Sequence, residues 1–437
     1  MKKSNYNHHF EQGQFSYWYN ALTNSFFRLT LSTGRHLQEY IESSEMIGEI
    51  ESQLPSLYEK LSKGGFIIED TKDEYGEIVK RAERASNDKN AFLIIVPTLN
   101  CNYACWYCIQ DHIPSLMSDE TIERVKRHID YMIREQGITS LHIDWFGGEP
   151  LMFFDKVVEP ISAYAKERCE EVDIPFINSA TTNGFFLTKD KLEKLKELNF
   201  NNFQITLDGN KENHDKVKFM NNLDSSFDHA LRNINQLLHY NVEMRMLLRI
   251  NYTHDNITNE IVDQVCERLD SDIRARITIL PRKVWQENVD REFGIPLREI
   301  LQKFENAGFI INYWEPMVAG VPCYVSKKLH KTINYNGYIL KCTASDDLYA
   351  TTPKGYIKED GSESWEEEYY GDYTSPTFLN ERCQPCRYLP VCYGQCPRNN
   401  LQCKNACKMD GQDTSFESNI IAFIDQHYKH ADFNQYK

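Results

Sequence analysis

The 437-residue sequence predicts an α/β fold: a partial (β/α)6 barrel, with a winged-helix-like module before it and a cysteine-rich domain after it. Apolar runs alternate with amphipathic stretches from residue 92 to residue 280, a pattern typical of parallel strands joined by helices. A hairpin pattern followed by helical patterns occupies the first 75 residues. Eight of the 13 cysteines follow residue 320, where few apolar residues recur with a regular period.

These patterns set the predicted domain boundaries. The winged-helix-like module covers 1–75, a linker 76–90, the barrel 91–285, a bridging region 286–322 and the cysteine-rich domain 323–437. Because little apolar surface is patterned in the last segment, bound metal clusters are expected to hold it together in place of a conventional core.

The first segment is predicted to begin with a β-hairpin and to close with a strand. Its predicted elements are hairpin strands at 15–19 and 25–30, helices at 34–41 and 54–61, and a strand at 66–68. His8 and His9 are expected to lie in a solvated chain end. The charged stretch 69–89 predicts a linker or a connecting helix.

The barrel segment contains six predicted strands and five predicted helices. The strands are expected at 92–97, 140–145, 176–182, 202–207, 242–251 and 273–280, and the helices at 118–136, 154–170, 188–198, 226–240 and 259–269. Ser118 is a good N-cap, with Glu120 and Glu123 near the positive end of its helix. Right-handed crossovers would place the functional site at the carboxyl ends of the strands.

Charge and composition exclude several classes of protein. The formal charge is −15, from 49 basic and 64 acidic residues, which disfavours nonspecific binding to nucleic acid or anionic lipid. The longest fully apolar run, 91–96, is too short to span a bilayer, and the first nine residues lack the apolar stretch of a signal peptide. We therefore expect a cytoplasmic protein with neither nucleic acid nor membrane as a partner. There, the cysteines stay reduced and serve as soft metal ligands.

Three cysteines directly after the first barrel strand form a C-x3-C-x2-C motif: Cys101, Cys105 and Cys108. Three thiolates on one loop can hold three irons of a [4Fe–4S] cluster and leave the fourth iron open to a substrate or cofactor. The alternative is a zinc knuckle or a set of buried free thiols. A structural zinc site uses four ligands, and His112 is the one further candidate on this loop.

This motif resembles the signature of the radical S-adenosylmethionine (SAM) enzymes, over about residues 90 to 285. The resemblance implies that the open iron binds the amino and carboxylate groups of SAM. One electron from the cluster would then cleave SAM to methionine and a 5′-deoxyadenosyl radical, which takes a hydrogen atom from substrate. It also implies that Tyr107, the aromatic residue before the third cysteine, lies against the adenine.

Further motifs follow the second and third strands. Gly147, Gly148 and Glu149 follow the second; the glycines allow a ligand to approach the backbone, and the carboxylate can receive an ammonium group. In the family that the chain resembles, this segment holds the amino group of SAM. Asn183 follows the third strand and is a further candidate contact to SAM.

The fourth strand ends in Thr-Leu-Asp-Gly at 206–209, with His214, Asp215 and Lys218 beyond it. This is similar to the Ser-Leu-Asp-Gly…His-Asp…Arg pattern of the subfamily related to anaerobic sulfatase maturases, in which the first residue and the last basic residue contact SAM. Thr206 keeps the hydroxyl, whereas Lys218 keeps the charge of arginine without its planar fork.

Other polar candidates lie near the predicted strand ends or near the cysteine-rich domain. Arg249 is a candidate for the SAM carboxylate or ribose, and a solvated strand-end arginine is the alternative. The sequence does not select a general base among five acidic candidates: Asp144, Asp208, Asp215, Glu315 and Asp346.

The remaining clustered cysteines are Cys323, Cys342, Cys383, Cys386, Cys392, Cys396, Cys403 and Cys407. Their spacing resembles the SPASM domain, which carries two auxiliary [4Fe–4S] clusters beside a radical SAM barrel. Eight thiolates suffice for two fully ligated clusters. Two or more zinc ribbons are the alternative. Cys169 and Cys266, within predicted helices, are expected to be structural thiols.

The SPASM resemblance implies a crossed set of ligands. The second auxiliary cluster would take Cys383, Cys386, Cys392 and a later cysteine, and the first would take Cys323, Cys342 and Cys396. Some members have one more cysteine, at the position of Met317. Cys403 or Cys407 therefore supplies a missing ligand, or the first cluster has an open iron. Cys407 is favoured as the closing ligand of the second cluster.

These resemblances imply an oxidoreductase with three [4Fe–4S] clusters and SAM. The predicted function is a radical SAM/SPASM maturase that takes hydrogen from a ribosomally made precursor peptide and installs a thioether or carbon–carbon crosslink, or another oxidation. The N-terminal module resembles domains that bind a leader peptide as an added edge strand; a cap over the barrel opening is the alternative. The expected partners are a precursor peptide or protein and an electron donor such as flavodoxin or ferredoxin.

Three alternative functions remain open at the level of sequence. The first is an anaerobic sulfatase maturase that forms formylglycine, and the second is an activator of a glycyl-radical enzyme. The third is a noncatalytic iron–sulfur scaffold, which need not retain the residues that bind SAM.

Overall fold

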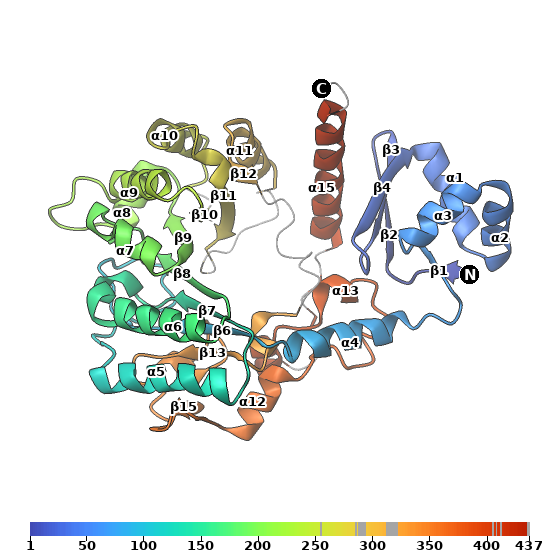
Figure 1. The fold of residues 1–437 in the computed structure, drawn as a ribbon. Helices are drawn as coiled ribbons and strands as arrows, with labels where there is room; N and C mark the ends of the chain where they lie inside the picture. Colours follow the sequence, from blue (N-terminus) through green and yellow to red (C-terminus); the bar gives the residue numbers. More distant parts are fainter. Residues whose placement is uncertain are drawn as a thin grey trace. The chain divides into compact units, whose positions relative to one another are not determined.

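The structure is a computed structural model that describes residues 1–253, 256–284, 286, 294–311, 322–403, 406–407, 409–410 and 413–434. The chain forms two compact units (Figure 1). Unit 1 consists of Met1–Asp88, Tyr313–Lys328 and Gly371–Lys437, and unit 2 of Lys89–Asn312 and Leu329–Tyr370. The start and the end of the chain therefore share one unit. The five predicted domain boundaries stay predictions.

Unit 2 is built on a nine-stranded sheet in the order β12-β11-β10-β9-β8-β7-β6-β13-β14. Its strands are β6 (Asn90–Ile95), β7 (Ser140–Trp145), β8 (Phe176–Thr182), β9 (Phe200–Leu207), β10 (Arg245–Tyr252), β11 (Ile277–Lys283), β12 (Ile310–Ile311), β13 (His330–Ile333) and β14 (Ile339–Leu340). Neighbouring strands are parallel except β13 and β14. A separate hairpin joins β15 (Gly355–Ile357) to β16 (Glu363–Trp365).

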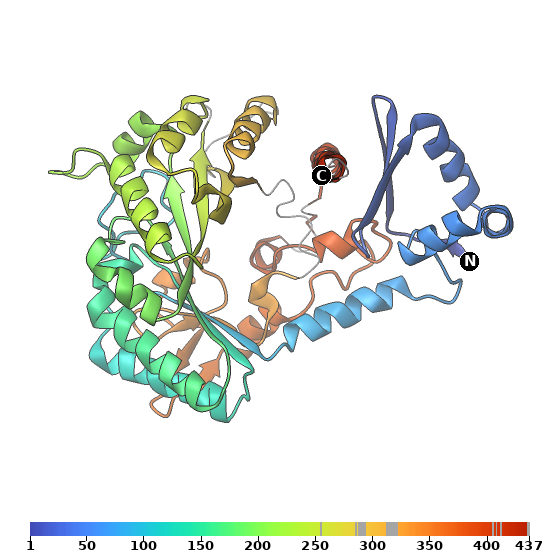
Figure 2. The ribbon, with the colours of Figure 1, turned by 45° about the horizontal axis from the view of Figure 1, so that its top comes forward.

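Helices connect the parallel strands and lie along one side of the sheet (Figures 1 and 2). They are α5 (Asp119–Arg134), α6 (Glu159–Glu171), α7 (Leu192–Glu197), α8 (Lys211–Val217), α9 (Ser226–Tyr240), α10 (Glu260–Arg268) and α11 (Gly294–Asn306). Ser118 caps α5 as predicted, because its hydroxyl accepts a hydrogen bond of 3.2 Å from the Thr121 N–H.

The predicted α/β fold is confirmed, and all six predicted strands are present in the predicted order. The sheet of the described residues is open, with β12 and β14 outermost, so the barrel is partial. β11 begins four residues later than predicted because Arg274–Arg276 form a short helical turn before it. The predictions did not include β12, β13 or β14, which lie outside the repeat of strand and helix.

Unit 1 begins with a three-stranded antiparallel sheet in the order β2-β3-β4. Its strands are β2 (Asn7–Gln12), β3 (Phe15–Asn20) and β4 (Ser25–Thr30), and a further pair joins β1 (Lys2–Lys3) to β5 (Ile67–Ile68). Three helices follow: α1 (Leu31–Ile41), α2 (Ser44–Gln53) and α3 (Pro55–Lys63). The predicted hairpin and closing strand are confirmed; α2 and β2 were not predicted.

The C-terminal part of the chain contributes α13 (Leu389–Cys392), α14 (Pro397–Gln402) and α15 (Asp413–Asn434) to unit 1. Helix α12 (Glu367–Thr374) spans the division between the units in the sequence. Helix α15 packs against β3 and β4. Asp425 accepts hydrogen bonds from the Tyr17 hydroxyl at 2.9 Å and from the Arg28 guanidinium at 2.8 Å.

Strand β3 separates two hydrophobic cores, because successive side chains of a strand point to opposite faces. On one face, Trp18 stacks on Phe27 with ring centroids 5.7 Å apart and packs with α1–α3. On the other face, Tyr17 and Tyr19 pack in a cluster that includes Phe416 of α15 and several cysteines of the C-terminal segment. Each face of the N-terminal sheet is therefore covered by helices.

The prediction of a solvated His8 is wrong. His8 is fully buried in β2, where one ring nitrogen lies 3.1 Å from the Arg387 carbonyl oxygen and the ring contacts Phe416 at 4.9 Å between centroids. Burial lowers the pKa of His8 to about 3, so the imidazole is neutral. Sequence patterning missed this position because its partners are near the other end of the chain.

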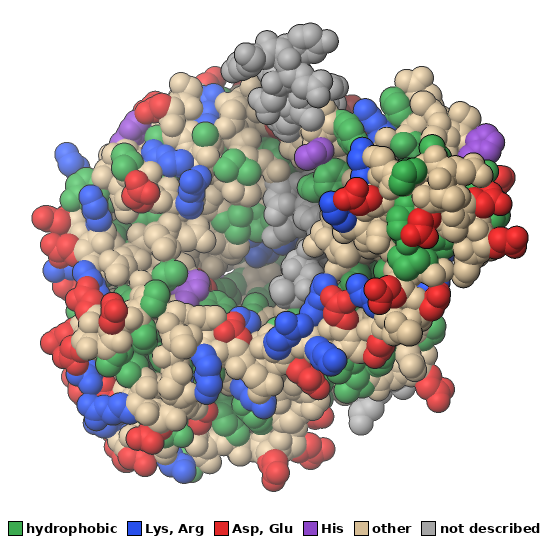
Figure 3. Space-filling model, turned by 45° about the vertical axis from the view of Figure 1, so that its right-hand side comes forward, with side chains coloured by type: hydrophobic (Ala, Val, Ile, Leu, Met, Phe, Trp, Pro, Cys, Tyr) green, Lys and Arg blue, Asp and Glu red, His purple; other side chains and the backbone are tan. Residues whose placement is uncertain are grey.

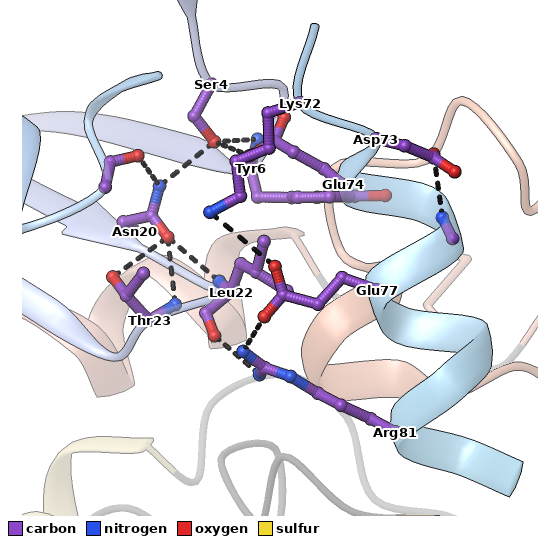
Figure 4. Close-up of polar contacts among 12 residues, drawn as sticks. Ser4, Tyr6, Asn20, Leu22, Thr23, Lys72, Asp73, Glu74, Glu77 and Arg81 are labelled. Carbon is purple, nitrogen blue, oxygen red and sulfur yellow. Dashed lines mark hydrogen bonds and ion pairs between the residues drawn. The ribbon is translucent and has the colours of Figure 1, made fainter. Parts of the chain in front are cut away.

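The charged stretch predicted as a linker or helix forms α4 (Glu74–Ser86), which polar contacts attach to the N-terminal sheet (Figure 4). Ser4 donates a hydrogen bond of 2.5 Å to Glu74, and Arg81 donates one of 2.7 Å to the Leu22 carbonyl oxygen. Asn20 is fully buried; its amide group donates to Ser4 and its oxygen accepts from the Leu22 N–H. Helix α4 is thus part of unit 1.

Basic and acidic side chains are interspersed over the face drawn in Figure 3. Among the described residues, no helix combines the length and the apolar character needed to cross a membrane.

Candidate functional site

The loop that follows β6 carries the three cysteines of the C-x3-C-x2-C motif. The Sγ of Cys101 accepts a hydrogen bond from the Tyr103 N–H at 3.5 Å, and the Sγ of Cys108 accepts one from the Gln110 N–H at 3.4 Å. Burial raises the pKa of Cys101 to about 12 and also raises the pKa values of Cys105 and Cys108. Three thiols on one loop, two of which accept a backbone N–H, fit a bound metal cluster, whose charge would keep them deprotonated.

The Gly-Gly-Glu segment after β7 packs directly on this loop. The Gly148 N–H donates to the Thr98 carbonyl oxygen at 3.1 Å, and the Glu149 N–H donates to the Asn100 carbonyl oxygen at 2.9 Å. A Cβ at Gly147 would stand 2.4 Å from the Thr98 oxygen, and one at Gly148 would stand 2.0 Å from the Asn100 oxygen. Glycine is required at both positions because a side chain would separate the segment from the cysteine loop.

The carboxylate of Glu149 is buried and hydrogen-bonded within the protein. It accepts from the Leu151 N–H at 3.0 Å, the Thr182 hydroxyl at 2.8 Å and the Asn183 N–H at 2.9 Å. Burial raises the pKa of Glu149 to about 7, against the effect of these hydrogen bonds. The carboxylate thus joins the ends of β7 and β8, and its contact with the amino group of SAM stays a prediction.

Asn183 links the Gly-Gly-Glu segment to the cysteine loop. Its side-chain amide donates a hydrogen bond of 2.8 Å to the Asn102 oxygen and lies 3.9 Å from the Sγ of Cys101. Its backbone N–H donates a hydrogen bond to the Glu149 carboxylate. The motifs after the first three strands therefore lie together at the carboxyl edge of the sheet. Asn102 was not singled out from the sequence, although it follows Cys101 directly.

The motif after β9 forms a second polar cluster, centred on Asp208. Tyr107 donates a hydrogen bond of 2.5 Å to Asp208 Oδ1, and Asn251 donates one of 3.2 Å to the same oxygen. Lys218 donates to Oδ2 in a buried ion pair. Burial alone would raise the pKa of Asp208, but the charge of Lys218 holds it below its ordinary value. Burial beside Asp208 raises the pKa of Tyr107, so its hydroxyl keeps its proton.

Thr206 and Arg249 are register partners on neighbouring strands β9 and β10. The Arg249 Nε donates a hydrogen bond of 2.8 Å to the Asn251 oxygen, and Asn251 in turn donates to Asp208. Arg249 is thus connected to the Asp208 cluster through Asn251. Asn251 was not predicted as a site residue; its polar side chain at the end of a predicted strand was the signal that could have found it.

The other acidic candidates have structural contacts. Asp144 accepts a hydrogen bond of 2.5 Å from Ser179, and burial raises its pKa to about 6. Asp215 accepts from the hydroxyls of Ser225 and Ser226 and from the Phe227 N–H. Asp346 begins a short helical turn. Glu315 lies outside the described residues. These contacts select no general base.

A cavity of about 230 Å³ in unit 1 brings four of the C-terminal cysteines together. Cys383, Cys386, Cys392 and Cys407 line it. Cys403 is exposed and is not among the lining residues. Burial raises the pKa of Cys386. Four cysteines around one cavity are the donor set of a [4Fe–4S] cluster, so these residues fit the group that the sequence led us to expect.

The remaining cysteines are divided between the units. Cys323 and Cys396 belong to unit 1, and Cys342 belongs to unit 2. Their assignment to one cluster stays a prediction, and Met317 lies outside the described residues. Cys169 is buried in α6, and Cys266 is half-buried in α10.

Comparison with known proteins identifies the class to which this site belongs. Residues 95–264 match the Radical SAM superfamily, and they contain the cysteine loop, the Gly-Gly-Glu segment and the Asp208 cluster. The chain therefore contains a radical SAM domain, and it is similar to sulfatase maturases and to peptide-modifying SPASM enzymes. The superfamily implies a [4Fe–4S] cluster and SAM.

Particular relatives cover different parts of the chain. It is 30% identical over 163 residues to the serine-type anaerobic sulfatase-maturating enzyme of Bacteroides thetaiotaomicron, a match that spans 35% of this chain and 37% of that enzyme. It is 22% identical over 400 residues to the radical SAM cyclopropyl synthase TigE of Paramaledivibacter caminithermalis, covering 82% of this chain and 81% of that enzyme.

One solved structure shares the fold over nearly the whole chain. The crystal structure of Streptococcus suis SuiB bound to the precursor peptide SuiA superposes with a TM-score of 0.51 at 16% identity and covers 92% of this chain and 97% of SuiB. This similarity shows a common fold.

Proposed function

We propose that the protein is a radical SAM maturase that removes hydrogen from a ribosomally made precursor peptide and installs a thioether or carbon–carbon crosslink, or another oxidation. The observation that carries the proposal is the position of Asn183. Its backbone is held by Glu149, and its side chain lies 3.9 Å from the Sγ of Cys101, so one residue links three motifs of a SAM site.

The chain's own residues would divide the work at this site as follows. Cys101, Cys105 and Cys108 would hold the cluster; when bound, the cluster and SAM supply a 5′-deoxyadenosyl radical. Gly147 and Gly148 let the Gly-Gly-Glu segment pack on the cysteine loop. Glu149 holds Asn183 in place, with the Asn183 N–H 2.9 Å from its carboxylate. Tyr107 would lie against the adenine, fixed by its hydrogen bond to Asp208.

Two further residues would line the same binding site. Thr206 and Arg249 stand at paired positions on β9 and β10, so they would approach SAM from the same part of the sheet edge. The connection of Arg249 to Asn251 would orient its guanidinium.

The auxiliary clusters are a second part of the proposal. Cys383, Cys386, Cys392 and Cys407 would hold one cluster, supported by the single cavity that they line. Cys323, Cys342 and Cys396 would hold the other, with Cys403 as a candidate fourth ligand. These clusters would receive the second electron of the oxidation or bind the substrate.

A peptide substrate is supported by one structural relative that binds a peptide by name. The SuiB structure contains a precursor peptide, and the N-terminal sheet of this chain has edge strands β2 and β4 that suit β-strand addition. A sulfatase substrate is the second candidate, favoured by the 30% identity to a sulfatase-maturating enzyme.

Anaerobic reconstitution and peptide assay test the proposal together. The full chain should bind about twelve irons, four for each cluster. Replacing Cys101, Cys105 and Cys108 by Ala should remove about four of them and abolish SAM cleavage. Incubation with peptides encoded beside the gene should yield a product that has lost two hydrogens. Zinc in place of iron, or modification of a sulfatase peptide alone, would contradict the proposal.

Replacing single cysteines tests the assignment of the four-cysteine cavity. Cys407→Ala should change the spectrum of one auxiliary cluster, because the cavity loses one of its four thiols. Cys403→Ala is the matched control and should leave that cluster unchanged. The reverse result would assign the closing ligand to Cys403.

A further inference from the structure

Lys218 and Asp208 form a buried pair where the family pattern expects a basic residue that contacts SAM. Asp208 follows β9 directly, and Lys218 caps the carboxyl end of the short helix α8. The side chains are 1% and 4% exposed, and Lys218 donates to Asp208 Oδ2. The two buried charges neutralise each other. Removing the lysine would leave the carboxylate buried without an opposite charge.

The same carboxylate holds the cysteine loop. Its other oxygen accepts from the Tyr107 hydroxyl at 2.5 Å and from Asn251 at 3.2 Å. Tyr107 lies between Cys105 and Cys108 in the sequence, so this bond attaches the cysteine loop to the end of β9. Asn251 extends the attachment to β10. One buried carboxylate therefore connects three strand ends of the sheet.

The backbone around Asp208 is fixed independently of the ion pair. The Asp208 N–H donates a hydrogen bond of 3.1 Å to Nδ1 of His214, a fully buried histidine of α8. The Lys218 N–H donates one of 2.8 Å to the His214 carbonyl oxygen. His214 thus accepts hydrogen bonds from the backbone N–H groups of both Asp208 and Lys218. The backbone that carries the pair is therefore fixed by α8 and the segment between β9 and α8.

We propose that Lys218 is the counter-ion of Asp208, not a ligand of SAM, and that Asp208 is a positioning residue that holds Tyr107 and the cysteine loop in the geometry that binds SAM. This inference rests on the proposed function. The carboxylate of SAM must then be received by another group, and the role of Lys218 is to neutralise the charge of Asp208. Removing both charges together should leave SAM binding nearly intact, whereas removing either charge alone should weaken it.

A double-mutant cycle on the reconstituted full chain separates the two roles of Lys218. Lys218→Met and Asp208→Asn should each weaken SAM binding by about tenfold or more, since each leaves one buried charge unpaired. The double variant should bind SAM within about threefold of the wild type, because it leaves no unpaired charge. If Lys218 contacts SAM, the double variant will bind SAM no better than Lys218→Met, which would overturn the proposal.

A spectroscopic measurement separates positioning from general stability. The electron paramagnetic resonance signal of the reduced SAM-binding cluster should change on SAM addition in the wild type and the double variant, and should change less in each single variant. Lys211→Met is the matched control: Lys211 is also on α8 and lies 2.8 Å from Asp215, without a contact to Tyr107. That control should keep the wild-type response; losing it would show that any change in α8 disturbs the site.

A second double-mutant cycle tests the positioning role of Asp208 if the first double variant does not fold. Tyr107→Phe removes the hydroxyl and keeps the ring, so adding it to Asp208→Ala, which has no acceptor for that hydroxyl, should cause little further loss of SAM affinity if the two residues act through one hydrogen bond. Additive losses would overturn the positioning role. A wild-type chain that binds iron but no SAM would defeat the proposed function, and the Asp208–Lys218 pairing would still be tested by the unfolding temperatures of the first cycle.

Discussion

The two units are assembled in opposite ways. In unit 2, seven of the parallel strands, β6 to β12, pair in the order in which they occur in the chain, so the connections between neighbouring strands are short and helical. In unit 1, the core joins the two ends of the chain: His8 lies against the Arg387 carbonyl oxygen, 379 positions away, and Tyr17 is bonded to Asp425. The N-terminal module therefore shares a hydrophobic core with the C-terminal segment of the chain.

This comparison changes how the N-terminal module is to be tested. Tyr17, Tyr19 and Phe10 pack in the same cluster as Cys383, Cys386, Cys392 and Cys407. Deleting the module would therefore remove part of the core beside the four-cysteine cavity. A loss of peptide binding after deletion would not separate recognition from stability, and point variants are required instead.

The largest effect is expected from removing the Phe416 side chain. Phe416 of α15 contacts His8, Phe10, Tyr19 and Tyr388, so Phe416→Ala should destabilise unit 1 by about 3–5 kcal/mol. Because a chain with two units need not unfold in one step, hydrogen exchange should be read segment by segment. Faster exchange is expected in β2–β4 and around Cys383, with β6–β11 unchanged.

Phe304→Ala is the matched variant in unit 2. Phe304 is fully buried and packs on Phe309 with ring centroids 5.3 Å apart. It should loosen the sheet of unit 2 and leave β2–β4 protected. If either variant loosens both units equally, the two units unfold together and the comparison fails.

The next effect concerns a backbone contact in unit 2. Gly148→Ala would place a Cβ 2.0 Å from the Asn100 carbonyl oxygen, and the shift needed to relieve the clash should cost about 1–3 kcal/mol. Because the contact joins the Gly-Gly-Glu segment to the cysteine loop, the iron of the three-cysteine cluster and the affinity for SAM should both fall. Iron analysis and SAM binding measure this.

Gly48→Ala in unit 1 is its control. Gly48 lies inside α2, and a Cβ there would meet no atom within 4 Å. Alanine should therefore stabilise that helix by about 0.5–1 kcal/mol without an effect on iron content. A loss of iron in this variant would mean that the result for Gly148 reflects handling of the protein and not the contact.

The regular part of unit 2 and the motif residues were predictable from the sequence because their signals are local. The strand runs, the cap at Ser118 and the motifs after β6 to β9 each occupy a few consecutive residues. The burial of His8 and the packing of α15 on β3 and β4 were not predictable from the sequence, because both depend on partners hundreds of positions away. The pair of Asp208 and Lys218 was likewise hidden, because α8 had to be placed before the charges could be matched.

Acid should weaken unit 2 through His128, which is fully buried in α5. Its Nδ1 lies 2.7 Å from the Gly361 carbonyl oxygen, an acceptor, so Nδ1 carries the proton and Nε2, 3.2 Å from the Lys331 ammonium, accepts. Burial, with the charge of Lys331, lowers the pKa of His128 to about 3. At pH values between about 6.5 and 3, His128 is protonated in the unfolded chain and neutral in the folded chain.

The stability of unit 2 should therefore fall as pH decreases below about 6.5, with a contribution from His128 of about 1.4 kcal/mol per pH unit. His128→Gln should reduce the slope by that amount, measured as the free energy of opening of β6–β11 between about pH 6.5 and 4.5. An identical slope in variant and wild type would show that His128 is not kept neutral by the fold. The cost of the substitution itself is read above pH 7, where both states of the histidine are neutral.

The smallest effect concerns the ion pair between the two ends of the chain in unit 1. The Asp425 carboxylate accepts from Tyr17 and Arg28, and the side chains of Arg28 and Asp425 are 22% and 30% exposed. Asp425→Asn keeps one acceptor oxygen and removes the charge, so the loss should be about 1 kcal/mol, expressed as faster exchange in β3 and β4. Asp410→Asn, which removes the more exposed pair with Arg382, should change exchange less, because solvent screens that pair. If Asp425→Asn has no larger effect than Asp410→Asn, helix α15 is held on the sheet by Phe416 and its apolar neighbours alone, and the polar contacts between the chain ends add little to the stability of unit 1.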